Sequence, residues 1–193
     1  MNFLIDGPHD APHTLVFAHG AGAPMDVPWM NTVARGVAAH GIRVVRFEFP
    51  YMAARRTGGK RGAPDRQPVL LQTWRDVVGE IGSDIVIGGK SMGGRMATMV
   101  ADELRVRGVV VIGYPFHPPG QPEKLRTAHL ETMTTPALIV QGTRDPFGTE
   151  EEVASYRISP TIAIEWLQGQ HSLSGKQLAA AIELTTKFVM RIT

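Results

Sequence analysis

Short apolar runs, many of them β-branched, alternate with segments of helical periodicity along almost the whole chain of 193 residues, and this alternation constrains the fold more than any other feature. Runs such as VVVI and ALIV are typical of strands buried on both faces. Strands are predicted at 14–19, 42–49, 84–89, 106–114, 137–142 and 161–167. Helices are predicted at 28–40, 69–81, 92–104, about 122–133, 149–157 and 174–191. The pattern predicts an α/β fold with a mostly parallel, doubly wound sheet flanked by helices.

One stretch interrupts the regular pattern. Residues 51–68, YMAARRTGGKRGAPDRQP, are rich in Gly, Pro and Arg and directly follow a predicted strand. We expect a loop there at the carboxyl edge of the sheet, where open α/β sheets bind ligands. No stretch is long enough to be a linker between two domains, so residues 1–193 are expected to form a single domain.

Composition excludes several classes of function. An apolar share of 43% with 20% charged residues is typical of a soluble globular protein. The net charge of only +2 gives no general reason to expect nucleic acid or a membrane surface as a partner. The chain has no cysteine, which excludes disulfides and a cysteine nucleophile. It shows neither a signal peptide nor an apolar run near the roughly 20 residues of a membrane span, so a cytoplasmic location is expected.

The segment VIGGKSMGGRMA, residues 86–97, allows two interpretations. A phosphate-binding loop requires GxxxxGK[ST], but Asp84 stands at the position of the first glycine. The dinucleotide pattern GxGxxG fails as well, because the nearest match, GAGAPM, ends in Met25. Gly89-Lys90-Ser91-Met92-Gly93 instead matches GxSxG between a predicted strand and a predicted helix. This is the sharp turn that exposes a nucleophilic serine, so Ser91 is the predicted nucleophile.

A serine nucleophile needs a base and an acid that orients the base. Three histidines follow Ser91: His117, His129 and His171. His171 comes directly after the last predicted strand, at the same sheet edge as Ser91, whereas His129 is expected on a helix surface and His117 has no suitable acid before it. Asp145 follows the strand at 137–142 and also reaches that edge. The predicted catalytic triad is therefore Ser91, Asp145 and His171.

Acyl transfer also requires an oxyanion hole, formed by backbone N–H groups. One donor is expected from Met92, the residue after the nucleophile. The second is expected from the loop His19-Gly20-Ala21-Gly22 after the first core strand, with Ala21 favoured and Gly22 as the alternative. His19 is expected to hold this loop by hydrogen bonds rather than to act chemically.

Four motifs together resemble the α/β-hydrolase superfamily: HGAG at 19–22, GKSMGG at 89–94, GTRD at 142–145 and QHSL at 170–173. FPYM (49–52) and PDRQP (64–68) make the chain similar to the small dienelactone-hydrolase-like branch related to the testis-expressed-30 and NSL-complex-subunit-3 proteins. The resemblance spans about 14–191 and implies an α/β-hydrolase fold of about six to seven strands and a serine hydrolase without a cofactor. Dienelactone hydrolases proper use a cysteine nucleophile, so dienelactone activity itself is not expected.

The expected size of the substrate follows from the lack of a segment long enough to form a lid. About twenty residues separate the strand at 106–114 from the next one, which is too short for a full lid and favours a small acyl substrate. Tyr51, Tyr114, Phe116 and Met92 are expected pocket-wall residues. The sequence predicts no metal site and does not indicate an oligomeric state.

The loop after the second core strand allows a functional and a structural interpretation. Its basic residues are Arg55, Arg56, Lys60, Arg61 and Arg66. They form either a solvated surface loop or a recognition site for an anionic group of the substrate. Two functions remain open: a serine hydrolase that cleaves a carboxylic ester or thioester through an acyl-enzyme, and a non-catalytic interaction module that uses residues 55–66.

Overall fold

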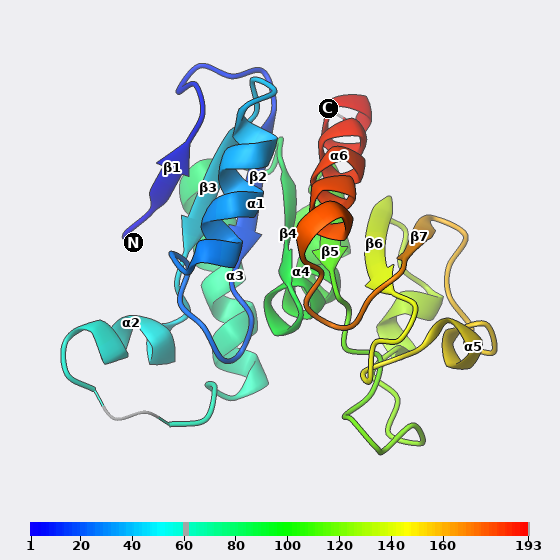
Figure 1. Cartoon of the computed structure of the whole chain (residues 1–193). Helices are drawn as coiled ribbons and strands as arrows, with labels where there is room; N and C mark the ends of the chain where they lie inside the picture. Colours follow the sequence, from blue (N-terminus) through cyan, green and yellow to red (C-terminus); the bar gives the residue numbers. More distant parts are fainter. Residues whose placement is uncertain (60–61, 193) are drawn as a thin grey trace.

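The computed structural model describes residues 1–59 and 62–192, in which a seven-stranded sheet forms the centre of the molecule (Figure 1). The strand order is β1-β3-β2-β4-β5-β6-β7. All neighbouring strands are parallel except β1, which pairs antiparallel with β3. The strands are β1 (Leu4–Asp6), β2 (Thr14–Ala18), β3 (Arg43–Phe47), β4 (Val86–Lys90), β5 (Gly108–Ile112), β6 (Ala137–Gly142) and β7 (Ile162–Leu167). The predicted mostly parallel sheet is confirmed.

Helices cover both faces of this sheet. They are α1 (Pro28–Ala38), α2 (Pro50–Arg56), α3 (Gln67–Ile81), α4 (Met92–Leu104), the 3-10 helix η1 (Ala128–Glu131), α5 (Glu150–Val153) and α6 (Gly175–Ile192). Helices α1 and α6 pack on one face, and α3 and α4 pack on the other (Figure 1). The doubly wound arrangement predicted from the sequence is thereby confirmed.

The core consists of two layers because strand side chains alternate between the faces. In β2, Leu15 and Phe17 lie in the layer beneath α1 and α6, whereas Val16 and Ala18 lie in the layer beneath α3 and α4. All four side chains are fully buried. Burial on both sides explains why the inner strands have continuous apolar runs instead of an alternating pattern.

Helix α6 shows how the helical period creates its packing. Leu178, Thr185 and Val189 are buried, and Ile182 and Ile192 are partly buried against the same core layer. These residues recur at spacings of three and four, which places them on one face of a helix. The helix predicted at 174–191 is confirmed.

Three sequence predictions about local structure are wrong. Residues 50–56 form helix α2 instead of a loop, because Pro50 occupies the first helical position and is followed by a helix-favouring run. Of the helix predicted at about 122–133, only the single turn Ala128–Glu131 forms, after the segment 113–127, which contains four prolines. The helix predicted at 149–157 is shortened to Glu150–Val153.

Strand β1 was not predicted because it has three residues and is mostly exposed. An ion pair fixes it: Arg46 on β3 is almost completely buried, and its Nη2 atom lies 2.6 Å from Asp6 Oδ2. The other terminal nitrogen of Arg46 donates to Met25 O at 2.6 Å and to Asn31 Oδ1 at 2.7 Å. A strand without a strong hydrophobic pattern is thus held by one buried arginine in addition to its backbone pairing with β3.

Two further observations bear on access to the sheet edge. Between β5 and β6, the only helical element in the described chain is the single turn η1, so no helical lid is inserted at this point. None of the helices in the described ranges is long and apolar enough to cross a membrane.

Candidate active site

Ser91 stands at a strained turn between β4 and α4. Its φ of 51° and ψ of −118° lie outside the regions that ordinary residues prefer. The turn requires glycine on both sides: a Cβ at Gly89 would lie 2.5 Å from Ala18 O, and one at Gly93 would lie 2.4 Å from His19 O. The geometry thus explains both glycines of GxSxG and presents the Ser91 hydroxyl at the carboxyl edge of the sheet.

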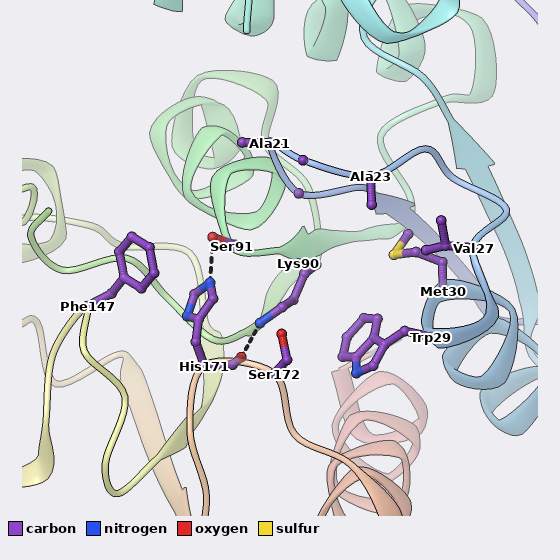
Figure 2. A pocket seen from close by; sticks show the side chains of 12 residues that line it. Ala21, Ala23, Val27, Trp29, Met30, Lys90, Ser91, Phe147, His171 and Ser172 are labelled. Atoms are coloured by element: carbon purple, nitrogen blue, oxygen red, sulfur yellow. Dashed lines mark hydrogen bonds between the residues drawn. The ribbon is translucent and has the colours of Figure 1, made fainter. Parts of the chain in front are cut away.

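His171 lies in the loop between β7 and α6 and points toward Ser91 (Figure 2). Its Nε2 atom is 2.9 Å from Ser91 Oγ, and its Nδ1 atom is 2.8 Å from Asp145 Oδ2. A proton on Nδ1, donated to Asp145, leaves Nε2 free to accept the serine proton. The structure therefore brings the three predicted residues together in the order nucleophile, base, acid.

The Asp145 carboxylate is fully buried and is fixed by more than the histidine. Oδ1 accepts a hydrogen bond from Phe147 N at 2.9 Å, and Oδ2 accepts one from Gln141 Nε2 at 2.9 Å. Gln141 is itself fully buried in β6, and its Oε1 atom accepts from Tyr114 N at 2.7 Å. Sequence reasoning missed Gln141, although a polar residue within the apolar run ALIVQG was a visible signal.

Lys90, directly before Ser91, is a second residue that sequence reasoning missed. Its ammonium group donates to the backbone oxygen of His171 and lies 5.5 Å from the centre of the Trp29 ring (Figure 2). Burial lowers the pKa of Lys90 to about 8, against a smaller opposing attraction from Asp145. Lys90 thus connects the nucleophile turn to the loop that carries the histidine.

The loop after β2 is held close to Ser91 by His19 and Tyr51. His19 is fully buried, its Nδ1 donates to Gly20 O at 2.7 Å, and its Nε2 accepts from Phe49 N at 3.2 Å. The Tyr51 hydroxyl donates to Ala21 O at 2.9 Å. The expected structural role of His19 is confirmed, and Tyr51 supports the loop from outside the cavities at Ser91.

Two cavities meet at Ser91, and both are also lined by Ala21 and Phe147. The first, called here the tryptophan cavity, measures about 320 Å³ and has Val27, Trp29, Met30, Lys90, His171 and Ser172 among its walls (Figure 2). The second, called here the arginine cavity, measures about 380 Å³ and has Asp65, Gln67, Met92, Arg95, Pro115 and Arg126 among its walls. A substrate bound at Ser91 could therefore extend into either cavity.

Several predicted pocket residues lie elsewhere. Tyr114 and Phe116 are fully buried and line neither cavity, because their side chains pack into the core layer beneath α3 and α4 while Pro115 between them lines the arginine cavity. His129 was expected on the surface but is half-buried, and its Nε2 atom is 2.9 Å from Thr98 Oγ1. Met92 does line the arginine cavity, as expected.

The arginines of the loop at 55–66 also differ from the expectation. Arg56 makes two contacts of 2.7 Å with Glu48 and one of 2.8 Å with Asp26, so its charge is already neutralised within the protein. Arg55 stacks over the Tyr51 ring at 5.2 Å and donates to Gly62 O at 2.6 Å. Neither lines a cavity at Ser91. Lys60 and Arg61 lie outside the described residues.

The sheet order, the helices on both faces and the serine at a strand–turn–helix junction define the α/β-hydrolase fold. The chain belongs to the Alpha/beta hydrolase domain family, whose model matches residues 11–187. Several solved structures share this fold.

An α/β serine hydrolase homologue from Coxiella burnetii is 24% identical, with a TM-score of 0.73 over 97% of this chain and 90% of that one. A serine hydrolase without a lid from Xanthomonas campestris is 18% identical, with a TM-score of 0.72 over 98% and 88%. A monoacylglycerol lipase from Paleococcus ferrophilus is 13% identical, with a TM-score of 0.78 over 100% and 99%. At these identities the likeness establishes the fold.

Proposed function

We propose that the protein is a serine hydrolase that cleaves a carboxylic ester or thioester of a small acyl substrate through an acyl-enzyme. The observation that carries this proposal is the chain of two contacts from Ser91 Oγ to His171 Nε2 at 2.9 Å and from His171 Nδ1 to Asp145 Oδ2 at 2.8 Å. Nucleophile, base and orienting acid within hydrogen-bond reach are what serine-dependent acyl transfer requires.

In the proposed mechanism, Ser91 Oγ attacks the carbonyl carbon while its proton passes to His171 Nε2. The tetrahedral intermediate then expels the alcohol or thiol, which takes that proton from Nε2, and leaves the acyl group on Ser91. Water then gives a proton to His171 Nε2 and attacks the acyl carbonyl carbon. The second tetrahedral intermediate releases the acid when its bond to Ser91 Oγ breaks, and Ser91 Oγ takes the proton back from Nε2. Asp145 holds the imidazole in the required tautomer and stabilises it when it becomes charged.

Two backbone N–H groups are proposed to stabilise the developing oxyanion. Met92 is the first residue of α4, so its N–H has no carbonyl within the helix to bind. Ala21 lines both cavities together with Ser91, and Gly22, the alternative donor, lines the tryptophan cavity. The positive end of the α4 dipole adds to the same effect.

The proposed substrate is small because each cavity holds only about 320–380 Å³. Absence of a helical lid between β5 and β6 in the described chain also favours short acyl groups over long lipid chains. Structural neighbours include an esterase domain from Rhodothermus marinus and a serine hydrolase without a lid, which agrees with this class of reaction. Membership of the narrower dienelactone-hydrolase-like branch stays a prediction.

The alternative function, an interaction module built on residues 55–66, is less well supported. Arg56 is neutralised by two carboxylates, which leaves this segment with less charge for a partner. The two proposals differ in whether Ser91 is chemically reactive.

Labelling with a fluorophosphonate probe tests that difference. The wild-type protein should be labelled and should hydrolyse 4-nitrophenyl butyrate, whereas Ser91→Ala should lose both properties while it keeps its circular dichroism spectrum. The matched control is Ser83→Ala, which changes an exposed serine before β4, at the opposite edge of the sheet. Equal labelling and turnover in Ser91→Ala would exclude the proposed nucleophile.

A further inference from the structure

The arginine cavity contains two cations that the protein does not neutralise. Arg95 and Arg126 both line it, both are half-buried, and within the described residues neither makes an ion pair. The Nε atom of Arg95 is buried without a hydrogen-bond partner, and one terminal nitrogen donates to the neutral amide oxygen of Gln67 at 3.3 Å. Arginines that lie in the interior are normally paired, since an unpaired buried charge is costly.

The electrostatics of the neighbouring groups agree with an excess of positive charge. Burial and then repulsion from Arg95 lower the pKa of Arg126. Burial and then the same repulsion lower the pKa of His129 to about 4. The one carboxylate that lines the cavity, Asp65, already accepts a hydrogen bond from Tyr51 N at 2.8 Å. The lining therefore has two positive charges against one negative charge.

The position of Arg95 relates this charge to the reaction centre. Arg95 lies four residues after Ser91 on α4, and its N–H donates to Ser91 O at 2.9 Å. Residues four apart share one face of a helix and are separated by about 6 Å along its axis. An anionic group about three or four bonds from the scissile carbonyl would therefore reach the guanidinium. Apolar neighbours such as Met92 and Pro115 reduce competition from water.

We propose that Arg95 and Arg126 form a subsite for a carboxylate of the substrate, so that the preferred esters carry a negative charge a few bonds from the reacting carbon. The planar fork of a guanidinium matches the two oxygens of a carboxylate. This proposal rests on the proposed hydrolase function, and it assigns the specificity that the sequence had placed at Arg55, Arg56 and Arg61.

The first experiment compares kcat/KM for matched charged and neutral esters. One pair carries the charge in the acyl part, mono(4-nitrophenyl) glutarate against 4-nitrophenyl valerate. The other pair carries it in the leaving group, carboxymethyl butyrate against ethyl butyrate. In the wild-type protein the charged member should be preferred in at least one pair. In the double variant Arg95→Gln, Arg126→Gln, that preference should fall about 10- to 100-fold, because charge-assisted hydrogen bonds are lost.

The neutral esters correct for any general loss of activity in the double variant. Arg107→Gln is the matched control for charge, since Arg107 pairs with Asp84 before β4 and β5, at the opposite edge of the sheet. It should retain the wild-type preference. An unchanged preference in the double variant for both pairs, with esters still hydrolysed, would overturn the subsite and leave the hydrolase function in place.

The second experiment does not depend on turnover. Ser91→Ala protein is titrated with monomethyl glutarate, and the His129 ring signals are followed by NMR. A carboxylate bound beside Arg95 should shift the His129 ring signals at pH 7, where the ligand is ionised, and the effect should disappear when Arg95→Gln and Arg126→Gln are added. No shift at millimolar ligand would contradict the subsite. A shift in a protein that hydrolyses no ester would support the subsite and reject the proposed function.

Discussion

The two cavities that meet at Ser91 hold their positive charges in different ways. In the tryptophan cavity, the Lys90 ammonium donates to His171 O and lies over the Trp29 ring, so the protein itself satisfies the charge. In the arginine cavity, Arg95 and Arg126 have no acidic partner in the described chain. A charge that is satisfied internally fixes structure, whereas one that is left unsatisfied is available to a ligand. We infer that Lys90 positions the histidine loop and that the arginine pair selects the substrate.

The largest expected effect concerns the proposed triad, which we expect to serve both cavities equally. Asp145→Asn should lower kcat about 10⁴-fold, because an amide no longer fixes the required tautomer of His171. The loss should be the same for esters that extend into either cavity, measured as initial rates with the charged and the neutral glutaryl and valeryl esters. Asp84→Asn, at the opposite sheet edge, is the control and should keep full activity. A loss confined to one class of ester would mean that Asp145 acts on one cavity instead of on the shared base.

The positions that meet at this edge show how far sequence reasoning extends. The carboxyl ends of parallel strands share one edge, so Ser91, Asp145 and His171 could be placed together from the order of strands alone. The same reasoning failed for Tyr114 and Phe116, because whether a residue just after a strand points into a cavity or back into the core depends on packing.

The cavity charges could not be predicted for a related reason. Arg95 was visible only as a polar residue in a helix, and its lack of an acidic partner is a property of the surrounding fold. The contact of Lys90 with His171 joins residues 81 positions apart. Local sequence patterns predict helices, strands and turns. To predict that an arginine has no acidic partner, one must know every residue that surrounds it in the fold.

The tryptophan cavity should respond to the size of the acyl group. Trp29→Ala removes its largest apolar wall, so kcat/KM for 4-nitrophenyl hexanoate should fall about tenfold more than for the acetate, which corresponds to lost burial of about two of the four additional methylenes at about 0.8 kcal/mol each. Trp29→Phe is the matched variant and should retain most of the chain-length preference. If both esters lost activity equally in Trp29→Ala, the cavity would not be the acyl site.

Lys90 should have a smaller effect on rate and a distinct effect on stability. Lys90→Met should lower kcat several-fold through a less fixed His171 loop. Burial lowers the folded-state pKa of Lys90 to about 8 from an ordinary 10.5, so between these values the unfolded chain binds more protons. The free energy of unfolding of the wild type should therefore rise with pH in that window relative to Lys90→Met. Urea unfolding at pH 7, 9 and 10.5 measures the difference, and parallel pH curves for the two proteins would contradict the assigned pKa.

The smallest expected effect on catalysis comes from Arg56, the paired counterpart of the cavity arginines. Arg56→Gln should change the preference for the charged ester less than about twofold, within the range of an exposed charge contact. It should instead destabilise the protein by about 1–3 kcal/mol, because the nearly buried Glu48 carboxylate loses its two contacts with the guanidinium. Kinetics with the glutarate and valerate esters measure the preference for the charged ester, and urea unfolding measures the loss of stability. A large loss of preference at unchanged stability would indicate that the loop at 55–66 recognises the substrate. It would contradict the proposed difference between paired and unpaired arginines.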